Sequence, residues 1–317
     1  MTDLEKGAVL ILVQVVPLAV GYGLKEKGFA REDWGRPISR FVIWFFNTAV
    51  AVLAVWVLPR RPEMAKLPLI AVMFGTAITF VALAMARLHP RHTRPDRGAY
   101  IVASSISNYG FTLGGFICLI FLSEKALAMS VVYIFPLVGF IYLVWFPIAR
   151  YYGTYARKVT PFQSFIMAFK DITTLPLLGT LVGLGLNLAG VERPGFLGPT
   201  NAVLVYSGTA TSMFTIGITL QLGSVGGYRA ESLSVAITKF IIGPLLGYGV
   251  AKLLGASQLQ TQVTVILSSV PVGLFASFAS SIFGLNRNLA NSMFVINTAA
   301  YLAIVLPLLV WLLSRIG

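Results

Sequence analysis

The chain has 317 residues, of which 57% are hydrophobic and 11% are charged, and its mean hydropathy is +0.83. Soluble domains carry roughly 25% charged residues, so this composition excludes a soluble globular protein and predicts an integral protein of a lipid bilayer. A net charge of +13 would suggest nucleic acid as the partner of a soluble protein. Basic cytoplasmic loops explain it better here, and we expect no nucleic-acid partner. The single cysteine, Cys118, excludes a disulfide framework within one chain.

A membrane-spanning helix needs about 20 predominantly apolar residues. The N-terminal segment lacks the basic start and the small-residue cleavage site of a signal peptide, so we interpret it as the first span. The predicted fold class is an all-α integral membrane protein. Ten spans are expected, at residues 7–24, 38–58, 67–88, 99–122, 126–149, 174–190, 200–222, 232–254, 259–285 and 290–314.

Lysine and arginine are distributed unequally between the two sides of these spans. The loops after the odd-numbered spans hold fifteen of them, and the opposite side holds eight. Because basic residues resist translocation, the richer side is predicted to be cytoplasmic. Both termini are then expected outside, in a protein of the plasma (inner) membrane.

The two halves of the chain resemble each other when the sequence is offset by 163 residues. Asn108 then aligns with Pro271, and Gly110 aligns with Gly273. LSEKALAMSVVY in the first half falls beside LNRNLANSMFVI in the second, and VGYG near the N-terminus aligns with VGLG at 182–185 at an offset of 162. The matches are sparse, but they recur in order at nearly one offset.

The offset predicts two repeats of five spans each, at residues 1–150 and 174–317. Five is an odd number, so the repeats have opposite orientations in the membrane, which is typical of secondary transporters. Residues 151–173 connect them, with Phe162, Phe165 and Phe169 at helical spacing. This linker fits either a cytoplasmic amphipathic helix or a loop packed against protein.

Spans four and nine contain residues that interrupt a helix. Pro271 has no N–H and clashes with the preceding turn, and Gly273 relaxes the backbone. In span four, hydroxyl and amide side chains compete with the backbone for hydrogen bonds and glycines loosen the helix. These residues are Ser104, Ser105, Ser107, Asn108, Gly110, Gly114 and Gly115. A break at membrane depth is tolerated only where protein or a water-filled cavity satisfies the backbone.

Two broken helices at matching positions are expected to cross near the middle of the membrane. Half-helices that start near Gly110 and Gly273 would then direct their positive dipole ends, about half a charge each, toward one point. This arrangement predicts a binding site for a small anion. The alternative is that Pro271 only kinks a packed helix.

Charged residues inside the spans are scarce. All eleven acidic residues lie in loops or at span ends, which argues against a proton relay or a sodium site built on a carboxylate. Lys239 is the one charge well inside a span, where insertion costs about 2.5–3.5 kcal/mol. It either supplies positive charge to an anionic substrate or extends its flexible stem toward the lipid headgroups.

Other polar residues carry weaker signals. Both histidines, His89 and His92, lie in a basic loop that we expect to be solvated, because two histidines alone make a poor metal site. Polar residues within spans, such as Asn47 and Ser212, either line a cavity or hydrogen-bond between helices. The chain has no Walker loop, serine elbow, HExxH motif or acidic metal cluster, so we expect no enzyme activity, no cofactor and no metal.

Six segments, in order along the chain, carry a family resemblance: VGYGLKEKGF, SNYGFTLGGFICLIFLSEKALAMSVVY, PLLGTLVGLGLNLAGVERPGFL, MFTIGITLQLG, ITKFIIGPLLG and VPVGLFASFASSIFGLNRNLANSMFVINT. Over most of its length the chain resembles the auxin efflux carrier (PIN-like) family of ten-span transporters. The resemblance implies the fold of bile-acid sodium symporters, with spans one, two, six and seven as a scaffold and the other six as a moving core. It also implies elevator-like alternating access, small organic anions as cargo, and a homodimer formed through the scaffold.

The sequence therefore predicts a secondary transporter for a small, carboxylate-type organic anion. The predicted substrate-binding residues are Ser107, Asn108, Tyr109, Gly110, Lys239, Pro271, Val272 and Gly273, with Asn47 and Ser212 on the scaffold side. Two alternatives stay open: a membrane receptor or sensor that transports nothing, and a sodium-coupled importer of the bile-acid symporter type. Coupling to Na⁺ or H⁺ is not decided, since hard cations also accept hydroxyl, amide and carbonyl oxygens.

Overall fold

A computed structural model describes residues 3–60, 62–89, 91–154, 174–220 and 227–316. Within these ranges the regular structure is helical, apart from one isolated bridge between two residues. Helices suit this composition because each satisfies its own backbone hydrogen bonds. Most of the predicted linker, residues 155–173, lies outside the described ranges.

The α-helices are α1 (Asp3–Leu10), α2 (Val16–Glu26), α3 (Gly35–Phe41), α4 (Thr48–Trp56), α5 (Lys66–Met85), α6 (Arg94–Ser105), α7 (Gly114–Ile117), α8 (Glu124–Phe140), α9 (Phe146–Tyr152), α11 (Leu175–Leu188), α12 (Leu197–Thr219), α13 (Arg229–Ile237), α14 (Gly243–Leu253), α15 (Gln258–Ser268), α16 (Leu274–Phe283), α17 (Arg287–Ala300) and α18 (Leu306–Ile316). Several of them are lengthened by, or joined through, π-helical segments. These are η1 (Ile11–Val15), η3 (Val42–Asn47), η6 (Cys118–Leu122), η7 (Ile141–Trp145), η10 (Thr238–Ile242) and η11 (Tyr301–Val305).

Seven helical segments of the described chain are long and apolar enough to cross a membrane: Glu5–Glu26, Glu32–Trp56, Glu63–Leu88, Glu124–Tyr152, Leu197–Thr219, Arg229–Leu253 and Arg287–Leu309. The three other predicted spans coincide with interrupted or shorter helices. Span four is divided between α6 and α7, span nine between α15 and α16, and span six is α11, with 14 residues. The structure thus has the helices of a multi-pass protein, and the count of ten spans stays a prediction.

The described chain divides into two compact units. Unit 1 comprises Met1–Met64, Gly110–Val132 and Phe169–Leu220, and unit 2 comprises Ala65–Tyr109, Tyr133–Ala168 and Gln221–Gly317. Unit 1 contains the helices of the predicted scaffold spans, and it also contains residues 110–132, which the resemblance assigns to the core.

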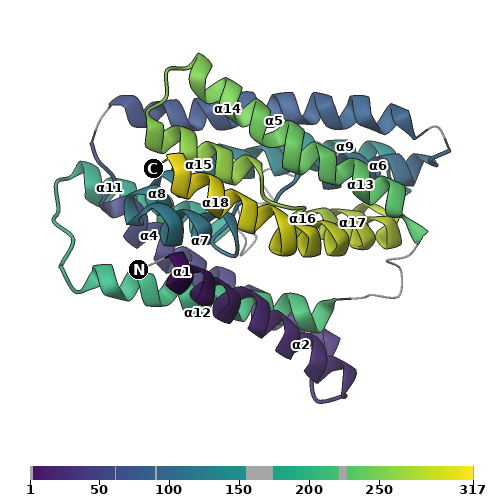
Figure 1. The fold of residues 1–317 in the computed structure, drawn as a ribbon, viewed down its shortest axis with the longest axis horizontal. Coiled ribbons are helices and arrows are strands. Elements are labelled where there is room, and N and C mark those ends of the chain that lie inside the picture. The colour runs from purple at the N-terminus through teal and green to yellow at the C-terminus, as the bar shows by residue number, and fades with distance from the viewer. Residues whose placement is uncertain (1–2, 61, 90, 155–173, 221–226, 317) are drawn as a thin grey trace. The chain divides into compact units, whose positions relative to one another are not determined.

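Within unit 1, α2 packs along α12 and α4 packs along α11 (Figure 1). Each contact depends on a glycine of the repeated VGYG and VGLG motifs. A Cβ on Gly21 would collide with the carbonyl oxygen of Phe214, and a Cβ on Gly183 would collide with that of Val52. The second glycine of each motif, Gly23 or Gly185, has no such neighbour. The two halves of the sequence therefore use the same motif position for close helix packing.

A partly buried ion pair also links elements of unit 1. The guanidinium of Arg193 binds both carboxylate oxygens of Glu124, at 2.6 and 3.0 Å, and donates to the carbonyl oxygen of Leu53 at 2.9 Å. Asn201 donates to the same carboxylate at 3.0 Å. Hydrogen bonds to both partners offset the cost of removing them partly from water.

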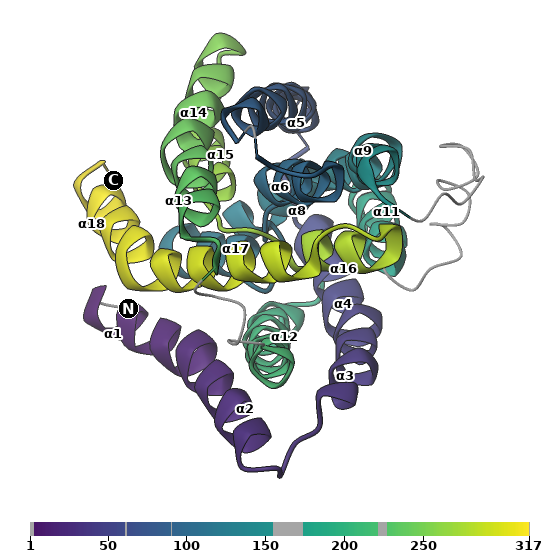
Figure 2. The ribbon, with the colours of Figure 1, turned by 90° about the vertical axis from the view of Figure 1, so that its right-hand side faces the viewer.

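In unit 2, α14 packs on α15 and on α5, α5 packs on α6, and α6 packs on α9, an order that can be followed in Figure 2. Helices α6 and α15 start in the same way, with a capping box. Thr93 and Asp96 exchange hydrogen bonds at the start of α6, and Ser257 and Gln260 do so at the start of α15. Capping boxes satisfy two N–H groups that a helix leaves free, so both starts are set by local sequence.

Candidate functional site: a crossing of two interrupted helices

Helices α6 and α15 end inside the apolar part of unit 2. Helix α6 ends at Ser105 and α15 ends at Ser268, which reproduces the 163-residue offset of the sequence halves. Extended backbone follows α6 directly and follows α15 after the turn residue Ser269, and α16 begins only at Leu274. The predicted breaks in spans four and nine are therefore present in the structure.

The two extended segments meet and pair with each other. Ser107 and Val272 form an antiparallel bridge. The N–H of Asn108 donates to the carbonyl oxygen of Pro271 at 2.9 Å, and the N–H of Gly273 donates to that of Ile106 at 3.1 Å. Each broken helix thus supplies partners for backbone groups that the other leaves without an intrahelical bond, as a low-dielectric surrounding requires.

Gly273 permits this close approach. A Cβ at this position would lie 2.7 Å from the carbonyl oxygen of Ser107 and 3.3 Å from the backbone nitrogen of Asn108. The sequence suggests only that Gly273 relaxes the helix. In the structure its main contribution is the absence of a side chain, which lets one backbone lie against the other.

Lys239 reaches the crossing from the α13–α14 segment. Its side chain is 1% exposed, and Nζ donates to the hydroxyl of Ser107 at 2.6 Å. The residue lies in the π-helical segment η10, between α13 and α14. Of the two interpretations of Lys239, extension to the headgroups does not agree with this position, because the ammonium is enclosed beside the crossing.

The polar side chains of the break play different parts. The hydroxyl of Ser105 is buried without a hydrogen-bond partner in the described chain, and that of Ser107 is bound to Lys239. Neither hydroxyl has a hydrogen bond to the backbone of α6 in the described chain, so the predicted competition of side chains with the helix ladder stays a prediction. The Asn108 side chain makes no hydrogen bond within the described ranges and is half-buried, and the Tyr109 hydroxyl donates to the carbonyl oxygen of Ser105 at 3.4 Å.

Seven of the ten predicted site residues belong to unit 2. They are Ser107, Asn108, Tyr109, Lys239, Pro271, Val272 and Gly273. Gly110, which follows Tyr109 directly, belongs to unit 1 together with Asn47 and Ser212. The helix after the first break also starts later than expected, at Gly114 instead of near Gly110.

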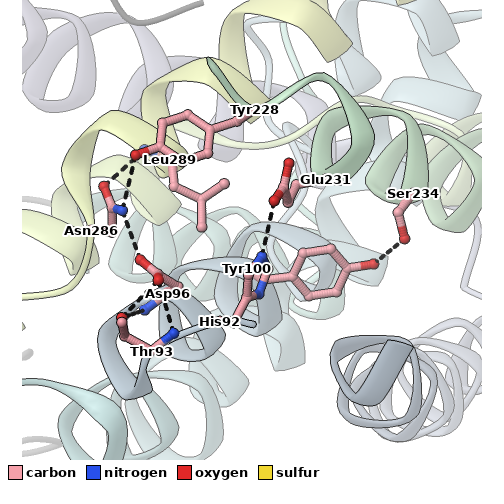
Figure 3. Close-up of polar contacts among 9 residues, drawn as sticks. All are labelled: His92, Thr93, Asp96, Tyr100, Tyr228, Glu231, Ser234, Asn286 and Leu289. Atoms are coloured by element: carbon pink, nitrogen blue, oxygen red, sulfur yellow. Dashed lines mark hydrogen bonds and ion pairs between the residues drawn. The ribbon is translucent and has the colours of Figure 1, made fainter. Parts of the chain in front are cut away.

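A second polar cluster occupies another part of unit 2 (Figure 3). Asn286 donates to Asp96 at 2.7 Å and to the hydroxyl of Tyr228 at 3.3 Å, which ties the start of α17 to the start of α6. Burial by itself raises the pKa of the Asp96 carboxyl, but hydrogen bonds from Asn286 and Thr93 outweigh burial and lower this pKa below its ordinary value.

The histidines belong to this cluster, and the expectation of a solvated loop is wrong. His92 Nε2 lies 3.1 Å from Glu231 Oε1 in the first turn of α13, and the His92 side chain is 8% exposed (Figure 3). The ring of His89 stacks on that of His92 with centroids 4.8 Å apart. Burial, and then the neighbouring His92, lower the pKa of His89, while Glu231 opposes this shift. Sequence reasoning missed the cluster because Glu231 follows His92 by 139 residues.

The fold and the crossing define a class: multi-pass helical membrane proteins in which two interrupted helices meet. Comparison with known families agrees, since residues 8–312 match the model of a family described as membrane transport protein. The chain belongs to this family, which confirms the recognition of a PIN-like transport family and indicates a transporter rather than an enzyme.

Curated relatives are distant but match along nearly their whole length. An uncharacterized transporter of Methanothermobacter thermautotrophicus is 23% identical over 299 residues, covering 91% of this chain and 92% of the relative. An uncharacterized transporter of Methanocaldococcus jannaschii is 22% identical over 307 residues, covering 94% and 96%.

Proposed function

We propose that this protein is a ten-span secondary carrier that moves a small, carboxylate-type organic anion across the plasma membrane. The observation that carries the proposal is the antiparallel crossing at Ser107 and Val272, with the ammonium of Lys239 beside it. Interrupted helices that meet within the membrane are typical of substrate sites in secondary transporters.

The chemistry of the crossing favours an anion. Helix α16 begins directly after it, and no side chain caps the N–H groups of its first turn. These groups and the helix dipole attract negative charge. Lys239 adds a cation that has one hydroxyl as its partner in the described chain. We assign Asn108, Tyr109, Gly110, Val272 and Gly273 to the cradle around the anion.

Several independent features of the two halves of the chain support two inverted repeats. Helices α6 and α15 share a capping box at the start and end at equivalent residues. Gly21 and Gly183 occupy equivalent motif positions and both permit close packing. The excess of basic residues in alternate loops supports an orientation with both termini outside.

Elevator-like alternating access is supported by the division of the chain. The pairing at Ser107 and Val272, together with Lys239, belongs to unit 2, and the helices of the predicted scaffold spans belong to unit 1. A compact unit that contains the crossing can move as a rigid body together with a bound anion. A homodimer through the scaffold is proposed from the family resemblance. No cofactor enters the proposal. The uptake assay described next tests coupling to Na⁺ or H⁺.

The test is flux of labelled mono- and dicarboxylates into proteoliposomes, with and without Na⁺ and at two pH values. We expect saturable uptake by the wild type and at least about ten-fold less by Lys239→Met, because a hydrogen bond to a charged group contributes about 1.5–3 kcal/mol. Methionine keeps the apolar volume, so unfolding should not become easier. Lys252→Met, which removes an exposed lysine of α14, is the control and should leave uptake unchanged.

Binding measured in parallel separates the alternatives. A ligand at 100 times its Kd stabilises the folded protein by about 2.7 kcal/mol, which a thermal shift detects. Carboxylate-dependent stabilisation without flux would favour a receptor. Flux that requires Na⁺ would favour the symporter type. Equal uptake by Lys239→Met and wild type would show that the ammonium does not serve the substrate.

A further inference from the structure

His89, His92 and Glu231 form a compact donor set in unit 2. One ligand atom from each residue lies within 4.8 Å of the ligand atoms of the other two. The contact between His92 Nε2 and Glu231 Oε1 measures 3.1 Å, and the two imidazole rings are nearly parallel, at 8°. The side chains of His92 and Glu231 are 8% and 19% exposed.

Two ring nitrogens in this set have nothing to bind. His89 Nε2 and His92 Nδ1 are both enclosed by protein, and neither has a hydrogen-bond partner in the described part of the chain. A buried polar atom without a partner is destabilising, so each such atom in a native protein calls for an explanation. A bound cation with nitrogen affinity supplies one.

We propose that His89, His92 and Glu231 bind a divalent transition metal ion of the Zn²⁺ type. Two imidazoles and one carboxylate form a three-ligand set found in open zinc sites, where water takes the fourth position. Ca²⁺ and Mg²⁺ prefer oxygen ligands and do not suit two histidines. This inference is independent of the proposed transport function.

The geometry requires a modest rearrangement. Zinc–nitrogen and zinc–oxygen bonds measure about 2.0–2.2 Å, so tetrahedral ligand atoms lie about 3.3 Å apart. The stacked rings must turn about their side-chain torsions to bring the three atoms together from within 4.8 Å. Arg94, two residues after His92, donates its guanidinium to the carbonyl oxygen of Tyr151.

Occupation of this site would join two elements that are remote in sequence. The histidines follow α5, whereas Glu231 lies in the first turn of α13. The same continuous segment carries Lys239, about two helical turns further on. The metal would therefore hold the end of the helix that positions the crossing lysine.

The experiment uses the full-length chain, purified in detergent with a histidine-free tag, stripped with a chelator and titrated with Zn²⁺ or Co²⁺. We expect one equivalent to bind, with a Co²⁺ visible spectrum typical of four-coordination. Removing a residue that only hydrogen-bonds to a zinc ligand already weakens zinc affinity about 10–100-fold. Removing a ligand itself, as in His92→Gln or Glu231→Gln, should therefore weaken binding at least about ten-fold. Glu192→Gln removes an exposed carboxylate and serves as the control.

X-ray absorption of the zinc-loaded wild type tests the same point without a variant, and should show two imidazole ligands. Size-exclusion profiles establish that each variant is folded. Absence of binding by the wild type would overturn the proposal and leave a hydrogen-bonded His92–Glu231 pair. Equal affinity in Glu231→Gln, His92→Gln and wild type would also overturn it, since the metal would then bind elsewhere.

Discussion

Gly273 is the residue at which the crossing tolerates no side chain, because its Cα faces the backbone of Ser107 and Asn108. We expect Gly273→Ala to separate the paired segments. Overpacking of this kind costs about 1–3 kcal/mol, so the variant should unfold at lower temperature and transport less. Differential scanning fluorimetry and the uptake assay measure the two effects.

Gly249→Ala provides the matched control, because a Cβ at this position in α14 meets nothing within 4 Å. Alanine also has the higher helix propensity, so this variant should be as stable as the wild type or more stable. If Gly273→Ala had the same melting temperature as Gly249→Ala, the two segments would not be in close contact in the native protein.

At the scale of the element, Pro271 separates α15 from α16. Its carbonyl oxygen accepts the N–H of Asn108, and its ring prevents α15 from continuing. We expect Pro271→Leu to extend α15, remove the pairing with residues 106–108 and abolish uptake while the protein is still produced. Expression level and uptake are the measurements. Pro244→Leu, at the start of α14, should be tolerated, and wild-type flux in Pro271→Leu would count against the crossing as the site.

The sequence predicts these elements well where the signal is local. Pro271 and Gly273 mark the second break, which the structure has between α15 and α16. The helix after the first break begins at Gly114 instead, and its N-cap, Leu113, has no side-chain cap. No proline or capping side chain marks that start, so its position depends on packing within unit 1.

At the scale of the whole molecule, the charge distribution predicts the sidedness of the loops. Cys118 is the single cysteine and is buried, so Cys118→Ser is a background for introduced cysteines. We expect an impermeant maleimide to label Arg60→Cys and Glu192→Cys in intact cells. Arg91→Cys and Arg229→Cys should react only after permeabilisation. Labelling of Arg60→Cys and Glu192→Cys from opposite sides would contradict two inverted repeats of five spans.

The sequence alone determined that the chain is a helical membrane protein and where two helices are interrupted. Apolar run length, Pro271 and Gly273 act on the backbone near them, so their effect can be read along the chain. Only the tertiary structure decided which groups meet. Lys239 contacts Ser107 across 132 residues, and Glu231 contacts His92 across 139. Such pairs are brought together by the packing of whole helices, and no local sequence pattern shows that the two residues lie close together.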